Sequence, residues 1–282
     1  MAGDEVETVT HEVGARVLAG DFAGYMKLVV TPLVRVGQAE TGIHADAAAQ
    51  RRVFERTSLR ARHAGWDGLS FEMLGSVAIG GSSIFARFRM TPTIDGVATP
   101  LGRTEGGLFQ RIGERLMLRA RLNTTGGGYE SDSAYRPERE PVPVETAALT
   151  DAVRGLQQGL QQGDIARFLS SICLPMSLNY DDGVTPVRNA GDAVQVLAAY
   201  RQMNTEIASY DSELIDVMCC GPLLRAARFR IFTRLRDGGE LDPFTNLYFL
   251  RRGRDGWRVA LAFNAAIGRT LPPPPPLGRT IQ

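Results

Sequence analysis

Two stretches of the chain, about 140 residues apart, carry apolar residues at the three-, four- and seven-residue spacings of an amphipathic helix. The matching positions are Val6, Val13 and Val17 in the first stretch and Leu149, Leu156 and Leu160 in the second. In each copy a glycine ends this helix, an aspartate caps a second helix, and a proline ends that second helix. These punctuating residues are Gly20, Asp21 and Pro32 in the first copy and Gly163, Asp164 and Pro175 in the second. The pattern predicts two consecutive helices at the start of each copy.

After these helices, both copies continue with a short strand, a longer helix and four extended segments. The predicted strands cover 33–37 and 176–180, and the predicted longer helices cover about 45–64 and 190–207. Alternation is clearest in the last segment, which places Trp257, Val259, Leu261 and Phe263 on one face and Arg258, Ala260, Ala262 and Asn264 on the other. Helices followed by hairpin-linked strands predict an α+β fold, with the helices packed on one face of a curved antiparallel sheet.

A repeat of this length is too long for a solenoid unit, so each copy is expected to form its own domain. The stretch between the copies is polar, then rich in glycine and finally in proline, as is typical of a linker. We predict a first domain over 1–125, a linker over 126–145, a second domain over 146–268 and a proline-rich tail over 269–282.

Composition and charge narrow the classes of partner. The 282 residues are 44% hydrophobic and carry a formal net charge of +1, which gives no overall attraction to nucleic acid or to an anionic membrane. The first residues are acidic without an apolar run, and no stretch reaches the ~18 apolar residues of a membrane span. Cys173, Cys219 and Cys220 form no disulfide framework. We therefore expect a cytoplasmic protein that binds neither nucleic acid nor membrane.

The order of elements, the domain length and the phrase "L..GD...F...I..P" resemble the nuclear-transport-factor-2-like superfamily. That superfamily has a cystatin-like, cone-shaped fold and includes ketosteroid isomerases, scytalone dehydratase and polyketide-cyclase-like (SnoaL-like) proteins. The resemblance covers about 6–123 and 149–264, hence two tandem cones. It implies a pocket between the helices and the concave face of each sheet. No stretch matches the family's catalytic residues one by one, so the resemblance identifies a fold and leaves the reaction open.

Candidate chemistry lies in the second copy. Tyr180 and Asp182 follow its first strand, where a phenol beside carboxylates offers a proton donor and a base, although "NYDDG" also suits a turn. Asp216 interrupts an apolar strand, so it faces either solvent or the pocket. Asn246 and Tyr248 share one strand face and offer a carboxamide and a hydroxyl that could orient a ligand. The candidate site has Asp216 and Tyr180 as catalytic residues and Tyr248, Asn246 and Asp182 as ligand-binding residues.

Other polar residues favour plainer interpretations. His11, His44 and His63 lack the spacing of a metal site and are interpreted as surface residues, so we expect no metal and no other cofactor. Arginines recur with period two on three predicted strands, where a half-solvated sheet face or an interface explains them better than anion binding. These arginines are Arg87 and Arg89, Arg119 and Arg121, and Arg228 and Arg230.

Two functions stay open at this point. The first is a protein that binds a small apolar molecule, or a cofactor-independent isomerase, dehydratase or cyclase that acts on an apolar carbonyl compound. The second is a non-catalytic association or regulatory module. Because single cones of this superfamily often pair through their sheets, we also expect the fused copies to form an intramolecular pseudo-dimer within a monomeric chain.

Overall fold

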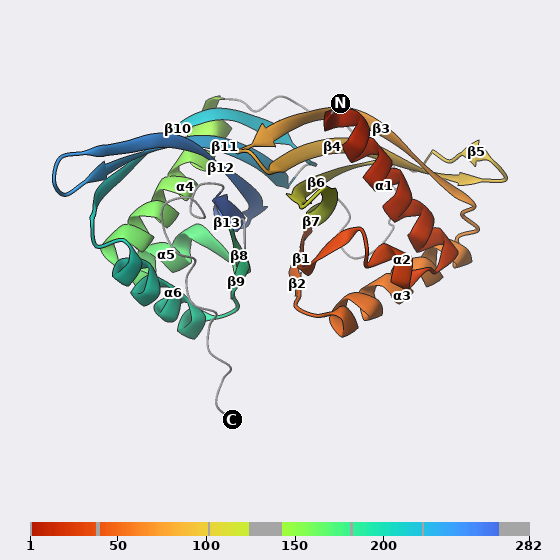
Figure 1. Ribbon diagram of the computed structural model, residues 1–282, viewed down its shortest axis with the longest axis horizontal. Coiled ribbons are helices and arrows are strands. Elements are labelled where there is room, and N and C mark those ends of the chain that lie inside the picture. The colour runs from red at the N-terminus through yellow and green to blue at the C-terminus, as the bar shows by residue number, and fades with distance from the viewer. Residues whose placement is uncertain are drawn as a thin grey trace. The chain divides into compact units, whose positions relative to one another are not determined.

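The computed structural model describes residues 2–37, 40–100, 102–123, 143–180, 183–221 and 223–264, which form two compact units (Figure 1). The first unit contains α1 (Ala2–Ala19), α2 (Phe22–Tyr25), β1 (Val29–Gly37), β2 (Thr41–His44), α3 (Ala47–His63), β3 (Gly68–Ile79), β4 (Ser83–Ile94), β5 (Val97–Ala98), β6 (Arg103–Ile112) and β7 (Arg115–Asn123). The second contains α4 (Pro143–Gln162), α5 (Ile165–Ser171), β8 (Ile172–Tyr180), β9 (Gly183–Val187), α6 (Ala190–Met203), β10 (Ile207–Cys219), β11 (Leu224–Leu235), β12 (Glu240–Gly253) and β13 (Gly256–Asn264).

The two sheets share one topology. The strand order is β2-β1-β7-β6-β4-β3 in the first unit, where β5 also pairs with β4, and β9-β8-β13-β12-β11-β10 in the second. The last four long strands of each unit form an antiparallel meander, and the first strand of each unit runs parallel to the last. The predicted α+β class and the two tandem domains are confirmed. The sequence pattern did not reveal the short strands β2 and β9.

The repeated phrase punctuates the helices as expected, except at its proline. Gly20 and Gly163 both adopt φ of 69°, the left-handed conformation that glycine takes without steric cost at a helix end. Asp21 accepts a hydrogen bond from the Gly24 backbone N–H at 2.8 Å, and Asp164 accepts one from that of Arg167 at 3.0 Å. The prolines do not end the short helices: Pro32 lies inside β1 and Pro175 inside β8.

A β-bulge in the last strand of each unit changes which side chains face the helices. Along β13, Val259 pairs with Leu250 but Leu261 pairs with Phe249, which leaves Ala260 as the extra residue. The predicted alternation is therefore wrong beyond Val259, because two residues opposite one partner reverse the facing of all that follow. Trp257, Val259 and Ala262 share the core under the helices. In β7 the equivalent extra residue is Arg119, between the pairs Leu118–Phe109 and Ala120–Leu108.

Each unit has its own apolar core between its helices and its sheet. In the first unit, valines of α1 pack against Phe88 of β4 and Phe109 of β6. In the second, leucines of α4 pack against Phe229 of β11 and Val259 of β13. The face of each sheet that contacts the helices is called the inner face below, and the opposite face the outer face. Figure 1 shows the helices of each unit covering the inner face of its curved sheet.

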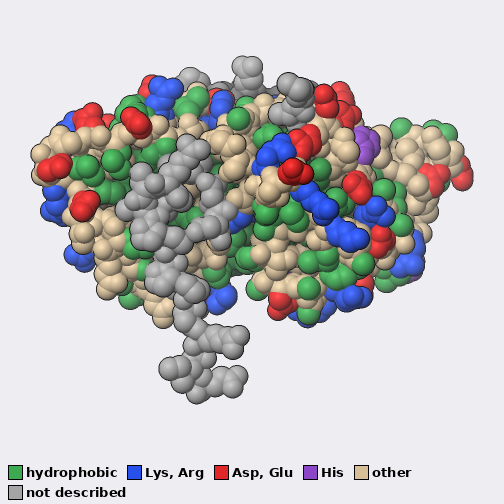
Figure 2. All heavy atoms as spheres, viewed as in Figure 1, with side chains coloured by type: hydrophobic (Ala, Val, Ile, Leu, Met, Phe, Trp, Pro, Cys, Tyr) green, Lys and Arg blue, Asp and Glu red, His purple; other side chains and the backbone are tan. Residues whose placement is uncertain are grey.

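Parts of the predicted domain boundaries lie outside the described residues, including 124–142 and the tail from 265. Helix α4 begins at Pro143, within the predicted linker, since proline suits the first turn of a helix. The association of the two units through their sheets stays a prediction. No helix among the described residues combines the length and the apolar character that a membrane span requires. Figure 2 shows acidic and basic side chains lying beside one another on the face in view.

Candidate functional site

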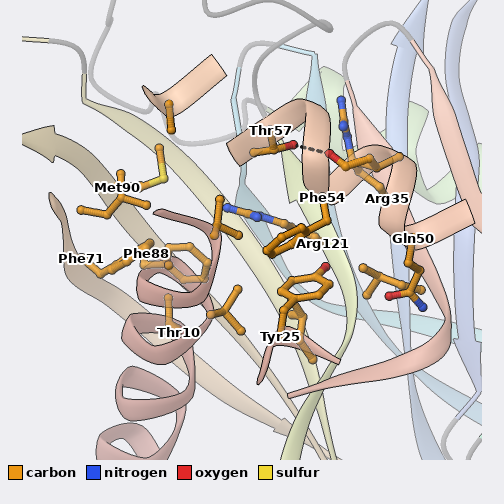
Figure 3. Close-up of a pocket in the computed structure, with 18 of the residues that line it drawn as sticks. Thr10, Tyr25, Arg35, Gln50, Phe54, Thr57, Phe71, Phe88, Met90 and Arg121 are labelled. Carbon is orange, nitrogen blue, oxygen red and sulfur yellow. Dashed lines mark hydrogen bonds between the residues drawn. The ribbon is translucent and has the colours of Figure 1, made fainter. Parts of the chain in front are cut away.

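The first unit encloses a cavity of about 100 Å³ between its helices and the inner face of its sheet. Its walls are largely apolar. Figure 3 shows Phe71, Phe88 and Met90 on the strand side and Phe54, Thr57 and Gln50 on the side of α3. An apolar pocket with a few convergent polar groups is the usual form of a small-molecule site, and those polar groups fix its chemistry.

One end of the cavity holds a cluster of arginines around a buried carboxylate. Glu105 of β6 is fully buried, and its Oε1 forms an ion pair with Arg103 Nε at 2.6 Å. Its Oε2 accepts a hydrogen bond from Arg121 Nε at 2.7 Å and another from Arg121 Nη2. Burial alone would raise the pKa of Glu105, but the positive charges of Arg103 and Arg121 hold it below its usual value. Glu105 is therefore ionised, and it orients both guanidinium groups.

Arg35 brings a third guanidinium to this end. It lies on β1 directly beside Arg121 of β7, and both line the cavity. Among the described residues, the Arg35 guanidinium makes neither a hydrogen bond nor an ion pair, whereas the Arg35 backbone pairs with β2 and β7. Burial lowers the pKa of Arg35, and the neighbouring charge of Arg121 lowers it further. The charges of Glu40 and Glu105 oppose this lowering without reversing it. Three guanidinium groups therefore gather around one buried carboxylate, Glu105.

Three uncharged side chains of the lining also have a polar atom without a hydrogen-bond partner within the described part of the chain. The Tyr25 hydroxyl, from α2, makes no hydrogen bond there, and burial raises the pKa of Tyr25 although Arg121 opposes this. Gln50 donates from Nε2 to Thr31 Oγ1 at 2.9 Å, while its buried Oε1 accepts nothing. His44 Nε2 is buried without a partner, and burial, Arg35 and other arginines lower the pKa of His44. His44 is therefore largely uncharged at neutral pH and could donate or accept a hydrogen bond.

The second unit has a smaller cavity, about 50 Å³, in the equivalent place. Its described lining holds no charged side chain. Asn246 Nδ2 donates to the Tyr248 hydroxyl at 3.1 Å and to Asn264 Oδ1 at 2.8 Å, and Gln157 Nε2 donates to the same hydroxyl at 3.3 Å. Burial raises the pKa of Tyr248. Several of these polar groups bond to one another, while Asn246 Oδ1 and Thr233 Oγ1 are buried without a partner.

The five residues singled out from the sequence separate in the structure. Asn246 and Tyr248 do line the second cavity together. Tyr180 is buried in the second unit's core at the end of β8. Asp216 lies on the outer face, bound by Arg228 Nε at 2.9 Å and by Arg228 Nη2, so it cannot act inside the cavity. Asp182 lies outside the described residues.

Sequence reasoning missed the polar end of the first cavity. His44, interpreted as a surface residue, lines that cavity instead. Arg119 and Arg121, expected on one face, point to opposite faces because of the bulge: Arg119 donates to Gln110 on the outer face while Arg121 turns inward. One signal was available, since Arg35 interrupts the apolar strand "LVRVG". On the outer face, Arg89 pairs with Glu72 at 3.0 Å, as a half-solvated sheet would arrange it.

Comparisons with known proteins found similar solved structures but no matching family. No protein-family model matches the chain, and no curated protein matches it. Solved structures that are similar include an NTF-2 like protein of unknown function from Shewanella oneidensis MR-1, with 11% identity and a TM-score of 0.37 over 44% of this chain and 100% of that one. A ketosteroid isomerase-like protein from Erwinia carotovora atroseptica SCRI1043 has 13% identity and a TM-score of 0.34 over 43% and 95%. A protein of unknown function with a cystatin-like fold from Nostoc punctiforme PCC 73102 has 9% identity and a TM-score of 0.37 over 48% and 96%. At these values no residue role is carried over to this chain.

Proposed function

We propose that the first unit binds a small, mostly apolar molecule, with the polar part of the ligand at the arginine end of the cavity. The observation that carries this proposal is the set of polar groups in the cavity that lack partners among the described residues. Buried polar groups in proteins are nearly always hydrogen-bonded, and one left unpaired costs about 1–3 kcal/mol. His44 Nε2 and Gln50 Oε1 are buried without a partner, so a ligand that paired with them would remove that cost, and Tyr25 and Arg35 offer it further hydrogen bonds.

The second unit supports the proposal by contrast. Its cavity has about half the volume, and Asn246, Tyr248 and Gln157 already bond to one another there. Asn246 Oδ1 and Thr233 Oγ1 are buried there without a partner, but the described lining of that cavity offers no charged group to a ligand. The first unit is therefore the better candidate for ligand binding, although the candidate residues in the sequence pointed to the second.

The test is a fragment screen by ligand-observed NMR on the full chain and on two matched variants. Val53→Phe fills the first cavity from α3, while Leu241→Phe fills the second from β12. We expect fragments of about one ring to bind the wild-type chain and Leu241→Phe, and to lose binding in Val53→Phe. Circular dichroism of both variants serves as the control for folding. Binding that is unchanged in Val53→Phe, or no binding at all, would overturn the proposal and favour the association module.

A second candidate function is proton transfer on the bound molecule. The observation that favours it is His44, whose lowered pKa leaves an uncharged imidazole as a base in the same cavity as the Tyr25 phenol. The substrate would be an apolar carbonyl compound. Deuterium exchange at the carbon beside the carbonyl of a bound fragment, followed by NMR in heavy water, tests this. Exchange should stop in His44→Gln and continue in His63→Gln. Binding without exchange would leave the protein a binder only.

A further inference from the structure

We propose that the ligand of the first cavity is an organic anion with an apolar body, and that Arg35 and Arg121 bind its charged group. This inference rests on the proposed function and adds the chemical class of the ligand. Four observations carry it: the charges that line the cavity, the partners those charges have, their geometry, and their replacement in the second unit.

The lining of the first cavity carries charge of one sign. Among the described residues, it includes Arg35, Arg60, Arg103 and Arg121, with no aspartate or glutamate. Two carboxylates outside the lining act on Arg35: Glu40, which is exposed, and Glu105, which is committed to Arg103 and Arg121. Neither carboxylate bonds to the partly buried Arg35 guanidinium, and a charge taken from water without a bonded partner is costly. An anionic group beside Arg35 would supply that partner.

The geometry suits a carboxylate. Arg35 and Arg121 are direct neighbours across β1 and β7, and Glu105 holds the Arg121 guanidinium in place from the other side. On β2, the residue opposite Arg35 is Gly42, which has no side chain to cover the guanidinium. The planar fork of an arginine matches the two oxygens of a carboxylate, and such charge-assisted hydrogen bonds are stronger than neutral ones. A phosphoryl group shares this chemistry but requires more donors than one uncommitted guanidinium supplies.

The second unit shows that the fold itself does not require these charges. The strand pair Arg35–Arg121 corresponds to Leu178–Ala262, and the pair Glu105–Asn123 corresponds to Asn246–Asn264. The remaining polar residues of the first cavity are matched in the same way. At the positions of Tyr25, His44, Gln50 and Arg103, the second unit has Phe168, Val187, Ala193 and Phe244.

One copy thus builds the same helices and sheet order around a cavity whose described lining carries no charge. Buried ion pairs can often be replaced by apolar side chains without loss of stability, and the second unit has made that replacement. The polar cluster of the first unit is therefore explained by a ligand better than by folding. The second unit also offers, within the same chain, a matched cavity without charge.

The experiment compares three probes of one ring: benzoate, its neutral isostere benzamide, and phenyl phosphate. Binding is followed by ligand-observed NMR and by the fluorescence of Trp66, which lines the cavity, in a Trp257→Phe chain that has no other tryptophan. Arg35→Leu installs the residue that the second unit has at this position. Arg89→Leu is the control, since it removes the same charge from the outer face of the same sheet.

We expect benzoate to bind more tightly than benzamide, and Arg35→Leu to weaken benzoate at least about tenfold while benzamide changes little. Arg89→Leu should leave both affinities as in the wild type. If phenyl phosphate instead binds more tightly than benzoate and loses the same affinity in Arg35→Leu, that result would support an anionic ligand and would identify its charged group as a phosphoryl group.

Other results distinguish a ligand that is not an anion from a cavity that binds no ligand. If benzamide binds as tightly as benzoate, or if Arg35→Leu does not weaken benzoate, the inference of an anionic ligand is overturned. The proposal that the cavity binds a neutral ligand would then remain. Failure of all three probes, together with fragments that do not respond to Val53→Phe, overturns the proposed function and this inference with it.

Discussion

The Nε of Arg121 lies 2.7 Å from Oε2 of Glu105, at the arginine end of the first unit's cavity. Because Glu105 is fully buried and Arg103 contacts its other oxygen, this pair is the centre of a small ionic cluster rather than a surface salt bridge.

Glu105→Gln should destabilise the first unit strongly. It removes the only negative charge of the cluster and leaves Arg103 and Arg121 buried and uncompensated. Breaking a buried pair from one side costs about 3–5 kcal/mol. Urea unfolding, followed by Trp66 fluorescence in a Trp257→Phe background, measures the free energy of unfolding of this unit.

Two further chains separate charge from side-chain identity in that experiment. The triple variant Arg103→Phe, Glu105→Asn, Arg121→Ala copies the second unit, and we expect it to be more stable than Glu105→Gln alone because no unpaired charge remains. Glu72→Gln, at an exposed pair, should change the free energy of unfolding by no more than about 1 kcal/mol. A triple variant less stable than the single one would mean that the cluster stabilises the fold.

His44 should make the first unit less stable in mild acid. Burial, Arg35, Arg56 and Arg52 lower the pKa of His44 from its usual 6.5 and outweigh the opposing effect of Glu40. Between the two pKa values the unfolded chain binds a proton that the folded chain does not, so stability is full above the usual pKa and falls as pH drops toward the lowered one.

Melting curves between about pH 7.5 and pH 5 measure this effect. We expect His44→Gln to flatten the fall in melting temperature across that range, and His63→Gln, which changes an exposed histidine at the end of α3, to leave it as in the wild type. Equal slopes in the wild type and His44→Gln would show that another group titrates there.

Removing the aspartate cap of a short helix should lower the stability of the unit that contains it, in both units. Asp164 accepts a hydrogen bond from the Arg167 backbone N–H, and Asp164→Ala should cost about 1 kcal/mol of the second unit's stability. Asp21→Ala should destabilise the first unit, because the hydrogen bond from the Gly24 backbone N–H, which lowers the pKa of Asp21, is lost. Urea unfolding with one tryptophan per unit reports each effect separately. A loss of stability confined to the unit without the substitution would contradict the assignment of each cap to its own unit.

Tyr248 and Asp216 should both prove structural. Tyr248→Phe removes the acceptor of Asn246 and Gln157, and we expect a loss of about 1 kcal/mol in the second unit. Asp216→Asn weakens a partly exposed pair with Arg228, and we expect about 1 kcal/mol or less. Fragment binding in the first cavity should not change in either variant. If either substitution abolished fragment binding, the second unit would be the better candidate for the ligand-binding site.

Local signals determined much of the architecture. The helix caps at Asp21 and Asp164, the glycines that follow the first helices and the order of helices and strands depend on residues close together in the sequence, so their patterns could be interpreted directly. The repeat itself predicted two domains of one topology. The prolines were placed wrongly, because a proline excludes helix without specifying where the preceding helix ends.

Which side chains meet inside each cone was decided only by the tertiary structure. A bulge at Arg119 and its equivalent at Ala260 reverses the facing of the residues that follow, and no local pattern marks a bulge that is defined by pairing with a distant strand. The bulge turns Arg121 toward Arg35 and Glu105, which lie far apart in the sequence. The sequence by itself therefore determined the two cones, whereas long-range strand register decided that the first one holds the charged cavity.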